Sequence, residues 1–129
     1  MLTLAPGRRV FAATGAVDFR KGFDGLVAIV RAQIGQDPFA GDFFCFFNRR
    51  RDRVKILVWD RNGFWLHYKR LERGTFERLD GAGPTRELDR ARMAMLLDGI
   101  DTKNSKSWKH FVPDVRIGAR SDDDRARVS

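Results

Sequence analysis

The Asn62-Gly63 dipeptide constrains the fold of this chain more than any other feature of its sequence. It separates two runs rich in β-branched and aromatic residues, VKILVWD at residues 54–60 and FWLHYKR at residues 64–70. Asparagine and glycine both tolerate the positive φ that tight hairpin turns require. The pattern therefore predicts an antiparallel β-hairpin with this dipeptide as its loop.

The position of the loop predicts the register, because it places Arg61 opposite Phe64. The face with the more apolar content, taken as the core face, carries the pairs Trp59 with Leu66, Leu57 with Tyr68, and Lys55 with Arg70. The other face carries Asp60 with Trp65, Val58 with His67, and Ile56 with Lys69. Like charges across a strand pair are unfavourable, so the pair of Lys55 and Arg70 indicates either a bound anion or two side chains that extend into water.

Three further segments are predicted as strands. The run FFCFF at residues 43–47 is apolar on both faces, which suits a central strand. Residues 8–13 and 75–79 are expected to form two shorter strands. The predicted fold class is α+β: an antiparallel four- to five-stranded β-meander with one long helix packed on a face. A short C-terminal helix would lie at the edge or on the other face.

The long helix is predicted at residues 18–34, where apolar residues recur at steps of three and four. Asp18 is expected to cap it, and Gly35 to end it. Two glycines disfavour the first turn, so a start at Asp24 is the alternative.

The short helix is predicted at residues 90–98. Asp89 is the expected N-cap, and Leu88 and Met93 have the spacing of a hydrophobic staple. Gly99 is expected to end the helix.

Length and composition predict one folded domain. The chain has 129 residues, 43% of them hydrophobic, and we expect residues 1–111 to form the domain. Residues 112–129 contain few apolar side chains and are expected to be disordered or extended. No apolar run reaches the roughly 18 residues of a membrane helix, and no signal peptide is recognisable. The single cysteine, Cys45, is interpreted as a core residue in a reducing compartment, so we expect a cytoplasmic protein.

Positive charge is concentrated in one part of the chain. The formal net charge is +8, and residues 46–78 carry ten basic against four acidic residues, which is +6 of that total. Such clustering favours a polyanionic partner. Nucleic acid, with DNA as the favoured class, is the expected partner; no membrane partner is expected, and association with the nucleoid is possible.

The candidate nucleic-acid-binding residues are arginines and lysines whose side chains suit phosphate oxygens, together with one aromatic residue. The basic residues are Arg49, Arg50, Arg51, Arg53, Lys55, Lys69, Arg70 and Arg73, with Arg20 and Lys21 as an extension near the first helix. Trp65, beside His67 and Lys69 on one strand face, is the predicted stacking platform for a single strand. The alternatives are burial of Trp65 under a helix or a partner, and a merely solvated arginine loop.

Recognisable catalytic motifs are absent. The sequence has two histidines, no glycine-rich phosphate loop followed by Lys-Ser/Thr, no HExxH and no nucleophile elbow. We therefore predict no enzymatic activity, no cofactor and no metal. A metal-dependent nuclease would have to use carboxylates such as Asp18, Asp24 or Asp60.

Three blocks of sequence together resemble a known family. They are VDFRKGFDGLVAIV at 17–30, DPFAGDFFCFFNRRRDRVKILVWDRNGFWLHYKRLERGTF at 37–76, and MAMLLDGID at 93–101. They are similar to the TnpB-type accessory proteins, the second-open-reading-frame proteins, of the sixty-six family of bacterial insertion sequences. The resemblance implies a role in transposition beside a separate DDE-type transposase, and it implies no assigned catalytic activity. Two departures are Leu88-Asp89-Arg90, where the family has Leu-Thr-Pro, and Arg78-Leu79, where it has Trp-Pro.

Three functions are therefore open. The leading one is a non-catalytic accessory protein that binds nucleic acid through a basic β-hairpin. The second is an adaptor that docks on the element's transposase, with Trp65 and the apolar faces as the interface. The third is a metal-dependent nuclease. Formation of a homodimer is also possible.

Overall fold

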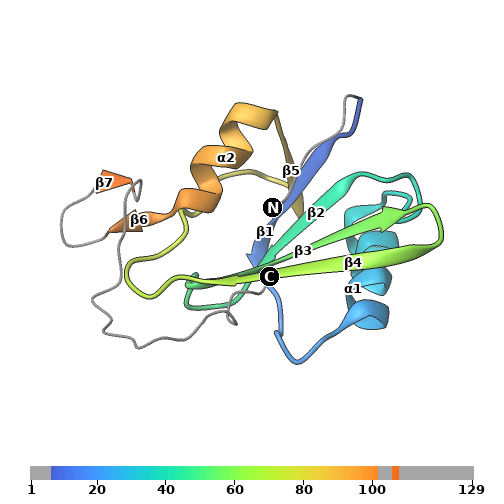
Figure 1. Cartoon of the computed structure of the whole chain (residues 1–129), viewed down its shortest axis with the longest axis horizontal. Helices are drawn as coiled ribbons and strands as arrows, with labels where there is room; N and C mark the ends of the chain where they lie inside the picture. Colours follow the sequence, from blue (N-terminus) through green and yellow to red (C-terminus); the bar gives the residue numbers. More distant parts are fainter. Residues whose placement is uncertain (1–6, 102–105, 108–129) are drawn as a thin grey trace, which may run out of the picture.

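A five-stranded sheet forms the centre of the structure, a computed structural model that describes residues 7–101 and 106–107 (Figure 1). The strand order is β4-β3-β2-β1-β5. The strands are β1 (Val10–Ala16), β2 (Phe43–Phe47), β3 (Arg53–Asp60), β4 (Gly63–Arg70) and β5 (Thr85–Leu88). A separate small ribbon pairs β6 (Ile100–Asp101) with β7 (Lys106–Ser107). The prediction of an α+β fold is confirmed in this form.

The sheet is mixed, which corrects the prediction of a purely antiparallel meander. β1 and β2 are parallel neighbours, whereas the β2-β3 and β3-β4 pairs are antiparallel, as expected. Between β1 and β2 the chain forms the helix α1 (Phe23–Ile29), continued by a π-helical stretch η1 (Val30–Ile34). A connection of this kind returns the chain to the end where it started, so the next strand pairs in parallel.

The first helix begins later than residue 18. Gly22 occupies the N-cap of α1 without a side-chain hydrogen bond, so the predicted cap at Asp18 is wrong and the alternative start near Asp24 is close to the observed one. The predicted end is confirmed, because Gly35 adopts the left-handed conformation with φ 76°.

The hairpin of β3 and β4 is present, but its register differs from the predicted one. Asp60 pairs with Gly63, so Arg61 and Asn62 form the loop, and Arg61 takes a positive φ of 56°. Trp59 therefore lies opposite Phe64. The shift is by two residues, which preserves the two predicted faces but changes every pair across them.

The two faces of the central strands are buried, each under one helical segment. α1 and η1 cover the face that contains Phe11, Phe44, Phe46 and Leu57. The helix α2 (Arg90–Asp98) covers the other face through Met93 and Leu96, which pack with Val10, Phe43, Cys45, Phe47, Val54, Ile56, Val58 and Phe76. β2 is buried along its whole length, as predicted for a central strand. Within the described residues, no helix is long and apolar enough to cross a membrane.

The segment after β4 is not the predicted strand at residues 75–79. Only Thr75 makes a bridge, to Ile100, while Phe76 and Leu79 fill the core under α2. The fifth strand is β5, which pairs antiparallel with β1. The second helix has its predicted bounds and cap: Asp89 accepts a hydrogen bond from the Arg92 N–H at 2.7 Å. The predicted tail at residues 112–129 lies outside the described residues.

Candidate nucleic-acid interface

A basic hollow lies at the carboxyl ends of the two parallel strands. The loop after β1 and the turn after β2 meet there, since the Val17 N–H donates to the Phe47 carbonyl at 2.9 Å. The hollow has a volume of about 550 Å³. Its lining residues are Ala16, Val17, Asp18, Phe19, Arg20, Asn48, Arg49 and Arg50. Three of the predicted phosphate ligands, from two loops far apart in sequence, are thereby brought to one concave surface.

The turn between β2 and β3 is held by the side chain of Asn48. Its amide oxygen accepts hydrogen bonds from the N–H groups of Asp52 and Arg53 at 3.1 and 3.0 Å, and its amide nitrogen donates to the Asp52 carboxylate at 2.6 Å. The Arg51 N–H closes the turn on the Asn48 carbonyl. Arg49 and Arg50, at the tip, are exposed. The turn therefore presents two guanidinium groups to solvent from an internally hydrogen-bonded loop.

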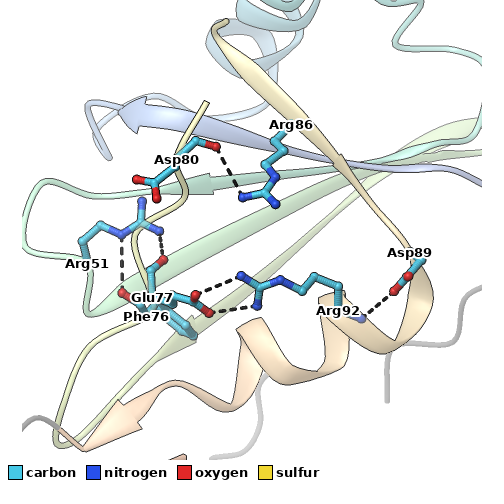
Figure 2. A network of polar contacts seen from close by, with 7 residues as sticks. All are labelled: Arg51, Phe76, Glu77, Asp80, Arg86, Asp89 and Arg92. Atoms are coloured by element: carbon cyan, nitrogen blue, oxygen red, sulfur yellow. Dashed lines mark hydrogen bonds and ion pairs between the residues drawn. The ribbon is translucent and has the colours of Figure 1, made fainter. Parts of the chain in front are cut away.

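Arg51 belongs to the core and is not part of the exposed surface. Arg51 is 3% exposed, and its side chain donates to the carbonyls of Phe76 and Glu77 (Figure 2). Its guanidinium lies 4.1 Å from the centre of the Phe47 ring. Burial lowers the pKa of this guanidinium to about 10, which keeps it charged at neutral pH. Arg51 attaches the turn to the segment after β4, so its donors are directed inward and away from a phosphate.

Lys55 has a similar role on the other loop. Lys55 is 7% exposed, and its Nζ donates to the carbonyls of Phe19 and Lys21, at 2.9 Å each. Desolvation lowers the pKa of this ammonium, while the nearby Asp18 carboxylate raises it. Lys55 faces Tyr68 rather than Arg70 across the hairpin, so the predicted clash of like charges does not occur there. Its two hydrogen bonds hold the loop that carries Arg20.

Asp18 is the acidic group of the hollow. Its carboxylate accepts hydrogen bonds from the Arg20 guanidinium, the shorter at 2.7 Å, and from the Arg20 N–H at 3.0 Å. The side-chain hydrogen bond from Arg20 is the main cause that holds the Asp18 pKa well below its usual range. Asp18 orients Arg20 at the rim and offsets one positive charge.

An aromatic pair adjoins the hollow on the α1 side of the sheet. Phe19, which lines the hollow, meets Tyr68 edge-on with ring centroids 5.9 Å apart. Arg53 donates to the Tyr68 hydroxyl at 3.1 Å, and Lys55 Nζ lies 5.4 Å from the ring centre. Tyr68 is nevertheless 44% exposed. The aromatic side chains beside the arginine turn are therefore Phe19 and Tyr68.

Trp65 lies away from this surface. It is 57% exposed, but it occupies the opposite face of β4 and pairs with Val58 near the hairpin loop. Its indole stacks on His67 with ring centroids 6.0 Å apart, and its N–H donates to the Asp60 carboxylate at 3.2 Å. Trp65 and the arginine turn are not brought together.

The remaining predicted residues lie around the end of β4. Lys69 is on the α2 side, where Nζ donates to the Leu97 carbonyl at 2.8 Å. Arg70 pairs with the Glu72 carboxylate at 3.0 Å, and Arg73 is exposed in the segment that follows. Lys21 is exposed beside Arg20. The structure thus places Arg20, Arg49 and Arg50 around the hollow, with Arg20 paired to Asp18. Lys69 and Arg70 have local partners elsewhere.

Sequence reasoning missed the parts that Tyr68, Phe19 and Asn48 play at this surface. Alternation along β4 places Tyr68 and Trp65 on opposite faces, so the pattern alone could have shown that only one of them adjoins the turn. The contact of Phe19 with Tyr68 depends on the crossover from β1 to β2, which no local pattern signals.

Among the described residues, no three side chains of histidine, cysteine, aspartate or glutamate are placed together to hold a metal ion. The Cys45 thiol is fully enclosed in the core, and burial raises its pKa to about 12. The arginines that line the hollow, Arg20, Arg49 and Arg50, offer hydrogen-bond donors and positive charge, chemistry that suits an anion.

Comparison with known proteins assigns most of the chain to one family. The family model described as "IS66 Orf2 like protein" matches residues 8–107, which confirms the resemblance seen in the motifs. Two relatives come from Sinorhizobium fredii. "Uncharacterized protein y4jC" is 43% identical over 76 residues, which are 59% of this chain and 65% of that protein, so the match spans just under two thirds of the relative. "Uncharacterized protein y4hO" is 34% identical over 110 residues, 85% of this chain and 90% of that protein. No solved structure matches the chain.

Proposed function

We propose that this chain, which belongs to the IS66 Orf2-like family of insertion-sequence accessory proteins, acts without catalysis by binding nucleic acid through the basic hollow. The observation that carries the proposal is the convergence of Arg20, Arg49 and Arg50 on one concave surface. Phosphate is an anion that several guanidinium groups on a loop suit well, because each guanidinium can donate two parallel hydrogen bonds to its oxygens. Lys21 and Arg53 would extend the contact along the rim.

Local rigidity supports the same proposal. The turn of Arg49 and Arg50 is held by Asn48 and Arg51, and the loop of Arg20 is held by Lys55. A preformed surface loses little conformational freedom when it binds, so each contact contributes more to affinity.

Binding to labelled nucleic acids, followed by fluorescence anisotropy, tests the proposal. Double-stranded DNA, single-stranded DNA and RNA, with the element's terminal repeats among the probes, would be titrated from about 50 to 200 mM salt. The R49A/R50A double variant should weaken binding to all sequences alike and reduce the salt slope by about 2, because each lost phosphate contact removes about 0.9.

The matched control is the R86A/R90A double variant, which removes the same charge from exposed positions on β5 and α2. It should leave the slope within error of the unmodified protein. If R49A/R50A binds as the unmodified protein does, the hollow is not the binding surface.

A second candidate function is that of an adaptor that docks on the transposase of the element. The exposed Trp65, at the hairpin end of β4 and away from the hollow, favours this candidate. An exposed tryptophan on an edge strand is typical of protein interfaces. A pull-down with the transposase from nuclease-treated extract tests this: capture that survives nuclease and is lost in the Trp65→Ala variant supports the adaptor. Capture that nuclease abolishes supports nucleic acid as the bridge.

The proposal of a non-catalytic protein is tested separately from binding. Supercoiled and linear DNA would be incubated with the protein and Mg²⁺ or Mn²⁺. Cleavage that the Asp18→Asn variant abolishes would contradict the proposal and favour a nuclease.

A further inference from the structure

Tyr68 adjoins the hollow on the α1 side of the sheet. Phe19 is the link: it lines the hollow and also contacts the Tyr68 ring. β4 is an edge strand of the sheet, so among the described residues no further strand covers the outer side of Tyr68. Tyr68 is 44% exposed, although its hydroxyl accepts from Arg53, its ring meets Phe19 and the Lys55 ammonium lies 5.4 Å from the ring centre.

The contacts around Tyr68 fix the ring and leave surface available. Phe19 meets it at an interplanar angle of 84°, and the hydroxyl accepts from Arg53. A base that stacks on such a ring does not have to order it first, which lowers the entropic cost of binding.

Stacking of this kind distinguishes a single strand from a duplex. In a duplex, neighbouring bases cover each other's faces, so only the end of the helix or a flipped base could reach the ring. A single strand exposes every base, and a positively charged groove beside an aromatic ring is the arrangement that such strands use.

We propose that the hollow and Tyr68 together bind single-stranded nucleic acid, with phosphates on Arg20, Arg49 and Arg50 and an adjacent base stacked on the Tyr68 ring. The inference rests on the proposed function and specifies its substrate class. Stacking is tolerant of base identity, so it does not require a defined sequence.

The test compares three probes of about twelve nucleotides, a length within the ~4–16 nucleotides that comparable sheets bind. They are an oligothymidylate, an abasic strand with the same phosphates, and a duplex. Tyr68→Ala should weaken binding of the oligothymidylate by about 5- to 150-fold, the equivalent of one stacked base. The same substitution should leave the affinity for the abasic strand unchanged. Tyr68→Phe, which keeps the ring, should retain the affinity, and Trp65→Ala on the other face is the control.

A second measurement needs no variant. The chain contains one tyrosine, so selective isotope labelling of tyrosine reports Tyr68 alone in NMR spectra. A stacked base should shift the ring signals on addition of oligothymidylate, and the abasic strand should not. This readout remains available if Tyr68→Ala does not fold.

The outcomes separate the inference from the proposal beneath it. One outcome would refute the single-strand inference and leave phosphate binding in place. In that outcome R49A/R50A weakens the binding of every probe, Tyr68→Ala does not weaken the binding of the oligothymidylate selectively, and the ring signals do not shift. If R49A/R50A changes nothing, the proposed function fails and the inference fails with it.

Discussion

At the scale of single residues, charge does not identify which side chains are available to a ligand. Arg51 and Lys55 lie within the most basic stretch of the sequence, yet both are buried and both donate to backbone carbonyls. A buried cation is tolerated only where hydrogen bonds replace its water. Arg51 and Lys55 thus hold the loops that expose Arg20, Arg49 and Arg50.

The Lys55→Met variant tests this structural role. Methionine has a similar length but no donor, so the carbonyls of Phe19 and Lys21 lose their partner. We expect the free energy of unfolding to fall by about 1–3 kcal/mol, measured by urea denaturation. Lys69→Met, which removes a single hydrogen bond at the surface, should cost less.

The opposite pattern would refute the role. If Lys55→Met keeps full stability but flattens the salt dependence of nucleic-acid binding, Lys55 contacts phosphate directly.

At the scale of elements, the segment after β4 is joined to α2 by one ion pair. The Arg92 guanidinium donates to both Glu77 carboxylate oxygens at 2.8 and 2.9 Å, and this pair lies beside the Arg51 contacts (Figure 2). The side-chain hydrogen bond from Arg92 lowers the Glu77 pKa from its ordinary value, more than desolvation raises it. The pair links α2 to the segment that receives Arg51.

This pair predicts a pH dependence of stability. A carboxyl group whose pKa is lower in the folded state stabilises the fold above its unfolded pKa, and that contribution is lost as the pH falls through the folded value. The free energy of unfolding should therefore decline as the pH falls below about 4.5. In the Glu77→Gln variant this acid-induced decline should be smaller. At neutral pH the variant should have a free energy of unfolding lower by less than about 1 kcal/mol, because the ion pair is partly exposed.

Urea denaturation between pH 3 and 7 measures both effects. Glu72→Gln removes an equal charge from the exposed pair with Arg70 and serves as the control. If the free energy of unfolding declined equally at acid pH in the unmodified protein and in the Glu77→Gln variant, the decline could not be assigned to the pair of Glu77 and Arg92.

Elements with local signals were predictable, and those that depend on distant pairing were not. The cap of α2 at Asp89, the end of η1 at Gly35 and the buried β2 each follow from a few neighbouring residues. The hairpin was also predictable, but its register was not, because Arg61 adopts a positive φ that glycine or asparagine was expected to take.

The parallel pairing of β1 with β2 and the addition of β5 depend on tertiary contacts. The predicted strand at residues 75–79 failed for a related reason: Phe76 and Leu79 pack under α2 instead of continuing the sheet. At the candidate site, sequence patterns located the arginine turn. They did not show that Arg51 and Lys55 are buried, or that Tyr68 rather than Trp65 is next to the turn.

At the scale of the whole molecule, the net charge of +8 has a cost for the free protein. Like charges on one surface repel each other, and this repulsion is relieved by salt or by a polyanionic partner. Under the proposed function, the crowding of exposed arginines at the hollow would favour binding at the expense of stability, a common relation at functional surfaces.

Salt should thus act on folding and on binding in opposite directions. Raising the salt concentration from about 50 to 500 mM shortens the screening length to a few ångströms. It should raise the free energy of unfolding while it weakens nucleic-acid binding. At low salt, R49A/R50A should be more stable than the unmodified protein by a few tenths to about 1 kcal/mol, and the difference should vanish at high salt. Urea denaturation at both concentrations measures it, with R86A/R90A as the control for charge outside the hollow. A double variant that is less stable at every salt concentration would instead mean that Arg49 and Arg50 contribute packing to the fold.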